Sequence, residues 1–320
     1  MKWKKLGKIF DPTEYNDGIV RDWMKEYAQC PSAVVYDDFV RVYFSSRPER
    51  DANGQATSYT GFFDVDIDDL HNIIRVSAKP VLPLGELGTF DENAVYPTCV
   101  LKQNDQYLLY YAGWSRCQSV PFNTSIGVAV SKDGVAFQRL GPGPILSASL
   151  YEPFVISGPK VRIYGDTWYM FYLAGTKWIS TDGKPEIVYK IRMATSNNGL
   201  DWVKVNRNII DDLVEENECQ AGPDVFYYNG KYHMYFVYRY ALDFRGNNGR
   251  GYKIGYAISE DLINWQRDDV NAGIAYSETG WDSQMHHYPH YFTVKGKAYL
   301  LHNGNEFGRY GIGLAVLEDE

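Results

Sequence analysis

Five segments of the chain share one pattern of apolar and polar positions. Each starts near a proline, continues as a short run rich in β-branched and aromatic residues, passes through a polar turn and ends in a second aromatic-rich run. The prolines are Pro31, Pro97, Pro159, Pro223 and Pro289, spaced 66, 62, 64 and 66 residues apart. The turns contain Asp, Asn and Gly, which are typical of connections between antiparallel strands. The pattern therefore predicts five repeated β-hairpins.

A third strand is predicted after each hairpin. Its sequences are IGVAVSKDGVAF from Ile126, IRMATSNNGLDW from Ile191, IGYAISEDLINW from Ile254, IGLAVLED from Ile312 and the weaker GFFDVDIDDL from Gly61. A looser fourth strand follows, as in VSAKPVL, LGPGPIL and VNRNII. Five units of four antiparallel strands predict an all-β fold, the five-bladed β-propeller. A row of β-sandwich domains is the alternative, but the regular spacing without linkers argues against it.

The two ends of the sequence complement each other. The third strand of unit five is followed only by the last few residues, whereas residues 3–10, WKKLGKIF, resemble the segment that begins at Phe137. We expect residues 3–10 to complete blade five, which would remove the open sheet edges. The prediction is one domain over residues 1–320, with blades that start near residues 26, 92, 154, 218 and 284.

Composition and charge exclude several classes of protein. The 320 residues are 45% hydrophobic, which is enough for a large core, and the net charge of −8 argues against binding to a nucleic-acid backbone. The basic start lacks an apolar run, and no stretch approaches 18 apolar residues, so neither a secretory signal nor a membrane span is expected. Four cysteines without a CxxC pair favour reduced thiols and a cytoplasmic location. The oligomeric state stays open.

The repeat places polar residues around one end of the axis, where first strands begin and second strands end. Five residues before the prolines stand Glu26, Glu92, Phe154, Glu218 and Gln284. Further acids, six or seven residues before the prolines, are Asp91, Glu152, Glu216 and Asp282. One residue after the prolines come Ser32, Thr98, Lys160, Asp224 and His290, and the second strands end at Arg47, Trp114, Lys177, Arg239 and Asn303. Carboxylates that meet cations and an indole suit a small, oxygen-rich and even anionic ligand.

Several of these residues also have structural interpretations. The acids could cap turns or hold neighbouring blades, and Asp91 and Asp282 follow an aromatic residue in what resembles a shared inter-blade turn. Phe137, Trp202 and Trp265 recur at the end of the third strand and are interpreted as packing residues. Cys30, Cys99 and Cys219 are interpreted as small buried apolar residues.

Four of the six histidines, His286, His287, His290 and His302, belong to the inner half of blade five. A metal site is one interpretation, but an HHxxH pattern on a strand alternates between faces and does not direct three imidazoles to one point. Hydrogen bonding to a ligand is preferred. We expect no metal and no other cofactor.

The repeat, with elements such as GPDVFYYNGKYHMYF, resembles the five-bladed glycoside hydrolases of the arabinanase/xylosidase and invertase types and the related mannoside phosphorylases. Pro223-Asp224-Val225 is similar to the arabinanase segment whose Asp tunes the general acid, and Glu218-Cys219 is similar to the Glu-Cys motif of invertases. The segment GTFDENAVYP from Gly88 is similar to the phosphorylases. The first-blade Asp-Pro motif of arabinanases is absent, because Cys30 precedes Pro31, and the Asn-Asp-Pro and Arg-Asp-Pro motifs of invertases are missing.

The resemblance implies a glycoside hydrolase that acts on a small or terminal sugar, including an anionic one, through paired carboxylates. We expect Glu218 as general acid, Glu92 or Glu26 as base or nucleophile, and Asp224 as the residue that tunes the acid. The expected substrate-binding residues are Arg47, Trp114, Lys177, Arg239, His286, His287, Asp91, Glu152 and Asp282. The alternatives are a glycoside phosphorylase, in which phosphate replaces water, and a non-catalytic carbohydrate-binding propeller.

Overall fold

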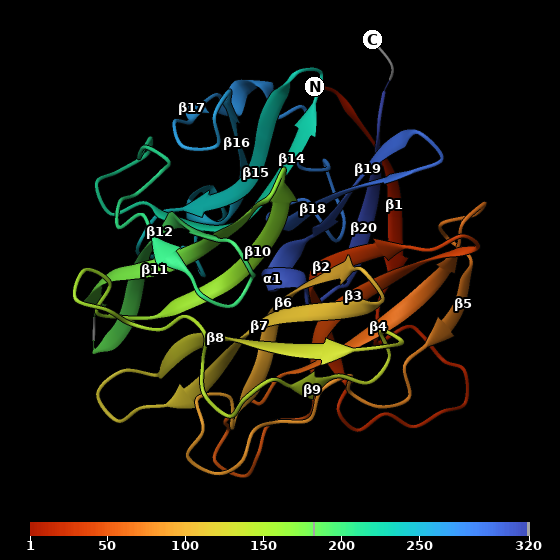
Figure 1. The fold of residues 1–320 in the computed structure, drawn as a ribbon, viewed down its shortest axis with the longest axis horizontal. Helices are drawn as coiled ribbons and strands as arrows, with labels where there is room; N and C mark the ends of the chain where they lie inside the picture. Colours follow the sequence, from red (N-terminus) through yellow and green to blue (C-terminus); the bar gives the residue numbers. More distant parts are fainter. Residues whose placement is uncertain (182, 319–320) are drawn as a thin grey trace.

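The computed structural model describes residues 1–181 and 183–318 as five four-stranded antiparallel sheets around one axis (Figure 1). Blade one consists of β2 (Glu26–Val35), β3 (Phe39–Arg47), β4 (Tyr59–Asp66) and β5 (Ile73–Val76). Blade two consists of β6 (Ala94–Gln103), β7 (Gln106–Arg116), β8 (Phe122–Ser131) and β9 (Gln138–Arg139). Blade three consists of β10 (Ile156–Tyr164), β11 (Thr167–Thr181), β12 (Lys184–Ser196) and β13 (Val203–Lys204).

Blade four consists of β14 (Cys219–Tyr228), β15 (Lys231–Arg239), β16 (Lys253–Ser259) and β17 (Gln266–Arg267). Blade five consists of β18 (His287–Val294), β19 (Lys297–Asn303), β20 (Ile312–Leu317) and β1 (Trp3–Phe10). The helical segments in the described residues are the short η1 (Asn248–Arg250), η2 (Asp269–Asn271) and α1 (Asn305–Gly308). The predicted all-β, five-bladed propeller is confirmed. That residues 1–320 form one catalytic domain stays a prediction.

The N-terminal strand closes the ring as predicted. β1 runs antiparallel to β20, with Trp3 opposite Leu317 and Phe10 opposite Ile312. The Trp3 indole also reaches the neighbouring blade, because its Nε1 donates a hydrogen bond to the Tyr235 hydroxyl at 2.6 Å. Blade five is therefore built from both ends of the chain, and β1 gives it the fourth, outer strand that the other blades also have.

The first strands β2, β6, β10, β14 and β18 neighbour one another in a closed ring around the axis. In each of them the strand register shifts at the repeated proline, so every axial strand carries a β-bulge at the same place. A bulge re-aims the side chains that follow it. The bulges therefore separate the residues at the mouth of the axis from those beneath them.

Aromatic side chains join successive blades through one repeated contact. A buried aromatic residue of the second strand packs edge-on against the aromatic residue that ends the turn after the third strand of the next blade. The pairs are Tyr43–Phe137 at 6.1 Å, Tyr110–Trp202 at 6.2 Å and Phe171–Trp265 at 6.1 Å between ring centroids. The predicted packing role of Phe137, Trp202 and Trp265 is confirmed, and much of the aromatic content serves this interface.

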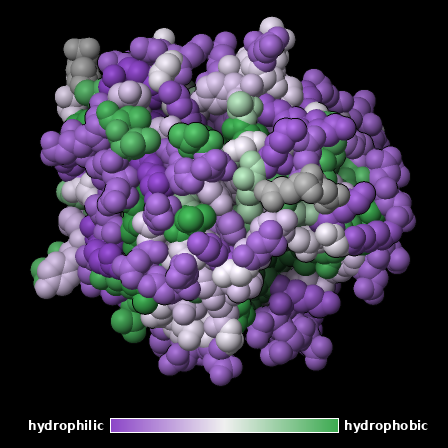
Figure 2. Space-filling model, turned by 90° about the horizontal axis from the view of Figure 1, so that it is seen from above, coloured by the Kyte–Doolittle hydropathy of each residue, from purple (hydrophilic) through white to green (hydrophobic). Residues whose placement is uncertain are grey.

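The face of the molecule in Figure 2 is mostly hydrophilic, with apolar residues in small separate groups. None of the helices in the described part of the chain has the length and apolar character needed to cross a membrane. Cys30, Cys99 and Cys219 are buried, Cys117 is exposed, and all four are free thiols. The cytoplasmic location stays a prediction.

Candidate functional site

A cavity of about 730 Å³ opens where the first strands begin and the second strands end. This volume lies in the range of small-molecule sites. The floor is formed by the residues that precede the axial prolines, namely Cys30, Tyr96, Gly158, Gly222 and Tyr288. The walls are largely aromatic and include Tyr27, Trp114, Phe122, Trp178, Tyr189, Tyr252 and Phe307. The cavity is called the axial pocket below.

The charged side chains of the axial pocket are mostly basic. They are Arg47, Arg50, Lys160, Lys184, Arg239 and Arg245, against Glu186 as the one carboxylate among the lining residues that the structure describes. Glu186 pairs with Arg245 at 3.2 Å, and the Arg245 side chain is largely exposed. Arg47, Lys160 and Arg239 form no ion pair with any carboxylate in residues 1–181 and 183–318. The pocket is therefore cationic within a protein whose net charge is −8.

Arg47 has donors to spare for a ligand. Its Nη2 donates only a long hydrogen bond, 3.4 Å, to Gln29, and its Nε is buried without a partner in the described residues. The guanidinium lies over the Tyr27 ring at 4.6 Å, which orients it without satisfying its N–H groups. Thr98, also in the pocket lining, has a buried hydroxyl without a described partner. Both groups can bind an oxygen-rich ligand.

Lys160 reaches the axis at the bottom of the pocket. Its Nζ lies 2.9 Å from Nδ1 of His290 and 3.3 Å from the Pro31 carbonyl oxygen. Burial, reinforced by Lys160 and Arg162, holds the pKa of His290 well below its ordinary value, so the imidazole is neutral. The backbone N–H of Ala33 donates to its Nε2 at 2.8 Å. In this tautomer the Nδ1–H of His290 faces Asp224 at 3.3 Å, so the acceptor that holds the Lys160 ammonium is the Pro31 carbonyl oxygen.

Asp224 lies beneath this floor and does not line the pocket. It is fully buried, forms an ion pair with Arg162 and lies 3.3 Å from His290. The structure therefore places the predicted tuning residue next to a buried imidazole, one side chain away from the cavity.

Arg239 is buried in the pocket wall and ties down the loop that follows β15. Its Nε donates to the Tyr252 hydroxyl at 3.0 Å, and its Nη1 donates to the carbonyl oxygens of Tyr240 and Ala241 at 2.8 and 3.0 Å. The Phe244 ring covers the guanidinium at 3.6 Å. Arg239 is 2% exposed, so its charge is largely removed from water without a compensating carboxylate in the described chain.

Four of the predicted site acids form a different arrangement, which we name the acid clasps. In blades two to five an acid between blades is buried and pairs with a base on the fourth strand of its own blade. The clasps are Asp91–Arg139 at 2.6 Å, Glu152–Lys204 at 2.5 Å, Glu218–Arg267 at 2.6 Å and Asp282–Lys5 at 2.6 Å. The four bases occupy one position of the repeat, opposite Ala129, Ala194, Ala257 and Ala315.

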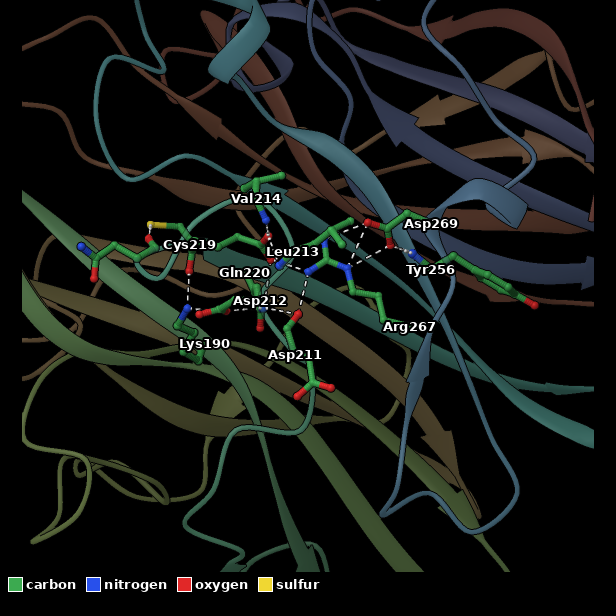
Figure 3. Close-up of polar contacts among 12 residues, drawn as sticks. Lys190, Asp211, Asp212, Leu213, Val214, Cys219, Gln220, Tyr256, Arg267 and Asp269 are labelled. Atoms are coloured by element: carbon green, nitrogen blue, oxygen red, sulfur yellow. Dashed lines mark hydrogen bonds and ion pairs between the residues drawn. The ribbon is translucent and has the colours of Figure 1, made fainter.

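Figure 3 shows the environment of the blade-four clasp, with Arg267 between Asp269 and the loop that carries Leu213 and Val214. Glu218 is fully buried, and one of its oxygens accepts hydrogen bonds from the backbone N–H groups of Leu213 and Val214 at 3.0 Å each. Its other oxygen accepts from Arg267 of β17 at 2.6 Å and from Gln220 of β14 at 3.0 Å, so the carboxylate joins the inter-blade loop to both strands. Glu218 therefore does not line the axial pocket, and its role as general acid stays a prediction.

Blade one replaces its clasp by apolar packing. Val76 of β5 pairs with Phe63 at the ladder position that the clasp bases occupy in the other blades, and Met24 precedes β2. Met24 and Val76 are buried in one apolar cluster together with Trp23. Among the described residues, blade one thus lacks the acid–base pair that the other four blades share.

The remaining predicted residues also lie outside the axial pocket. Glu92 caps its own loop, because its carboxylate accepts from the Gly88 N–H at 2.7 Å. Glu26 pairs with Arg309 at 3.4 Å beside the mouth. Lys177 points outward because a bulge between Gly175 and Lys177 reverses the alternation of β11, which brings Trp178 into the pocket instead. The predicted cluster of facing carboxylates is thus not assembled by the fold.

His286 and His302 belong to the blade-five clasp. Nitrogen and oxygen atoms of Asp282, His286 and His302 lie within 4.8 Å of one another, as they would around a metal ion. The Lys5 ammonium occupies this place, 2.6 Å from Asp282 and 3.1 Å from Nε2 of His286. Burial lowers the pKa of His286 to about 3, so the ring is neutral beside the lysine. The donor set is therefore already filled by a side chain of the protein.

Of the predicted substrate-binding residues, Arg47, Trp114, Arg239 and His287 line the axial pocket together. The sequence interpretation did not select Trp178, Glu186 and Arg245 as site residues, nor Lys160, which it placed on the axial strand. Glu186 and Trp178 lie on the β11–β12 hairpin, whose strands are the longest of the described sheets, and Arg245 lies in a long β15–β16 connection. Both segments are longer than the equivalent segments of the other blades, and this extra length is the signal in the sequence that could have identified their residues.

No family model matches the sequence. Over 320 residues the chain is 35% identical to the uncharacterized protein Rv1502 of Mycobacterium tuberculosis, and the match covers 100% of both chains. The chain belongs to the Rv1502 family. The match to the 1,2-beta-oligomannan phosphorylase of Thermoanaerobacter sp. is 28% identical over 194 residues, which is 60% of this chain and 58% of the phosphorylase.

The fold of this Rv1502 family member is shared with solved propellers. A structure described as a glycoside hydrolase matches with a TM-score of 0.75 at 16% identity, over 99% of this chain and 92% of that one. The resemblance to the five-bladed propellers of glycoside hydrolases is confirmed in the fold.

Proposed function

We propose that the protein is a carbohydrate-active enzyme of the glycoside phosphorylase type, which transfers a glycosyl group from a glycoside to inorganic phosphate. The observation that carries the proposal is the charge of the axial pocket, which combines Arg47, Lys160 and Arg239 without carboxylate partners in the described chain with the single carboxylate Glu186. The similarity to a phosphorylase over 194 residues supports the same reaction class.

Chemistry favours phosphate over water in such a pocket. Hydrolysis by paired carboxylates needs one carboxyl group to protonate the leaving oxygen and another to activate water or to attack the sugar. Phosphate carries its own anionic nucleophilic oxygen, so that one acid and a set of cations are sufficient. Arg47 and Lys160 would hold the phosphate, and the aromatic walls would hold the sugar. Glu186, once released from its ion pair with the exposed Arg245, would be the carboxyl group that protonates the leaving group.

The test is turnover of a panel of mannosides, including β-1,2-mannobiose, with and without inorganic phosphate. We expect formation of a sugar 1-phosphate that requires phosphate and rises with its concentration. Release of free sugar at the same rate without phosphate would replace the proposal by hydrolysis. Saturable saccharide binding without any product would replace it by the non-catalytic carbohydrate-binding propeller.

A further inference from the structure

The floor of the axial pocket is uneven, although its five residues occupy one position of the repeat. Cys30, Tyr96 and Tyr288 place side chains there, whereas Gly158 and Gly222 do not. The Tyr96 and Tyr288 rings meet edge-on at 6.4 Å, and their hydroxyl groups hydrogen-bond to each other. The floor is therefore closed on the side of blades five and two and open above blades three and four.

The backbone does not by itself require glycine at this position. Gly158 and Gly222 have φ of +64° and +56°, in the left-handed region that favours glycine. Cys30 and Tyr288 adopt φ of +56° and +49° at the equivalent positions and carry side chains there. The fold thus accepts the cost of a side chain in this conformation, which is about 1–2 kcal/mol.

Packing does not require glycine at 222 either. A Cβ atom on Gly222 would meet no atom closer than 3.7 Å, the Cδ1 of Tyr288. By contrast, a Cβ on Gly61 would lie 2.1 Å from the Trp23 ring, and one on Gly127 would lie 2.6 Å from Phe90. Those two glycines are required by neighbouring side chains. Gly222 instead borders empty space that belongs to the pocket.

We propose that the sugar ring transferred in the reaction lies against the backbone of Gly158 and Gly222, and that Gly222 sets the size of the ring and substituents that can enter. The inference rests on the proposed function and deepens it by assigning the sugar to one half of the floor. The Lys160 ammonium lies against Pro31 and His290 of blades one and five, and Arg47 belongs to blade one, so phosphate held by both would lie on that side and meet the sugar at the axis.

The experiment measures saccharide and phosphate binding by calorimetry for the full-length protein and its variants. Gly222→Tyr copies the side chain of the equivalent position 288, and Gly222→Ala is the smaller change. The control is Gly230→Ala, because Gly230 also has a positive φ of +82° and open space around it, but lies at the opposite end of the same β14–β15 hairpin.

We expect β-1,2-mannobiose, or the best-bound member of a glycan panel, to bind at least tenfold more weakly to Gly222→Ala and at least a hundredfold more weakly to Gly222→Tyr. Inorganic phosphate should bind all variants within about twofold, and Gly230→Ala should match the wild type. Unchanged saccharide binding in both Gly222 variants, or equal loss of phosphate and saccharide, would overturn the inference alone. A wild-type protein that binds no saccharide would overturn the proposed function and the inference with it.

Discussion

Arginine has two roles in two regions of this molecule. In the acid clasps Arg139 and Arg267 are largely covered, and each lies 2.6 Å from a buried carboxylate. In the axial pocket Arg47 and Arg239 are just as tightly surrounded by aromatic rings, but no described carboxylate balances their charge. Removing an unpaired charge from water costs several kcal/mol. A fold that keeps such a charge next to a cavity is suited to a ligand that supplies the missing anion.

The clasp residues repeat from blade to blade, whereas the pocket residues do not. The clasp acids recur because blades two to five each attach their outer strand to the loop that precedes their own first strand. The pocket residues differ from blade to blade because the ligand is not symmetric. In this propeller a residue that breaks the repeat is a better functional candidate than one that keeps it.

The largest predicted effect is on stability. Replacing Glu218 by Ala leaves the backbone N–H groups of Leu213 and Val214 without their buried acceptor, while Arg267 keeps its ion pair with Asp269. We expect the free energy of unfolding to fall by about 3 kcal/mol, measured by urea denaturation. The double variant E218A/R267M should not recover this loss, because it also leaves the Asp269 carboxylate without its cation. Glu218→Gln with wild-type stability and no turnover would instead restore Glu218 as the general acid.

The second prediction concerns Arg47, one of the pocket arginines without a described carboxylate partner. Arg47→Met should lower kcat/KM for phosphate about a hundredfold, which corresponds to about 2.7 kcal/mol. Its free energy of unfolding should stay the same or rise, because a half-buried charge without a carboxylate partner in the described residues is removed. Phosphate-dependent kinetics and urea denaturation on the same preparation test both parts. A drop in stability like that of Glu218→Ala would show that Arg47 is structural.

The third prediction is a loss of stability at mildly acidic pH through the blade-five clasp. The folded pKa of His286, about 3 because of burial, lies below its unfolded value near 6.5, so its contribution is complete above pH 6.5 and is lost as the pH falls toward 3. We expect a slope of about 1.4 kcal/mol per pH unit from this group between pH 6 and 4. Burial also lowers the pKa of His302, which adds to the slope.

Urea denaturation of the wild type and of His286→Gln across this pH range measures the effect. The variant removes one titrating ring but keeps a group that can hydrogen-bond to Asp282. Its stability should depend less steeply on pH. Identical slopes in the two proteins would exclude His286 as the source.

The smallest predicted effect is at Lys177. This residue ends its second strand like Arg47 and Arg239, but its side chain is exposed on the outer side of β11. Lys177→Ala should leave phosphate-dependent kcat/KM within about twofold of the wild type and stability within about 0.5 kcal/mol. A loss comparable with that of Arg47→Met would return Lys177 to the site.

The sequence predicted the architecture because the evidence for it is repeated five times, in the axial prolines and in the turn aromatics that join the blades. The site was harder for a physical reason. Alternation along a strand fails at a bulge, so Lys177 and Trp178 exchange sides, and Asp224 falls beneath the floor. Glu218 and Glu92 share a distance to the proline, but differences in loop length give them different partners. Such differences become visible only when the chain is folded.

The pairing of β1 with β20 has a consequence for biosynthesis. Trp3 leaves the ribosome first, and its partner Leu317 follows more than 300 residues later. At about 10 residues per second this interval lasts roughly half a minute. During that time β1 has no strand to pair with, and the blades made in between must stack without a closed ring. The final closure therefore depends on keeping one short N-terminal segment unpaired until translation of the last blade is finished.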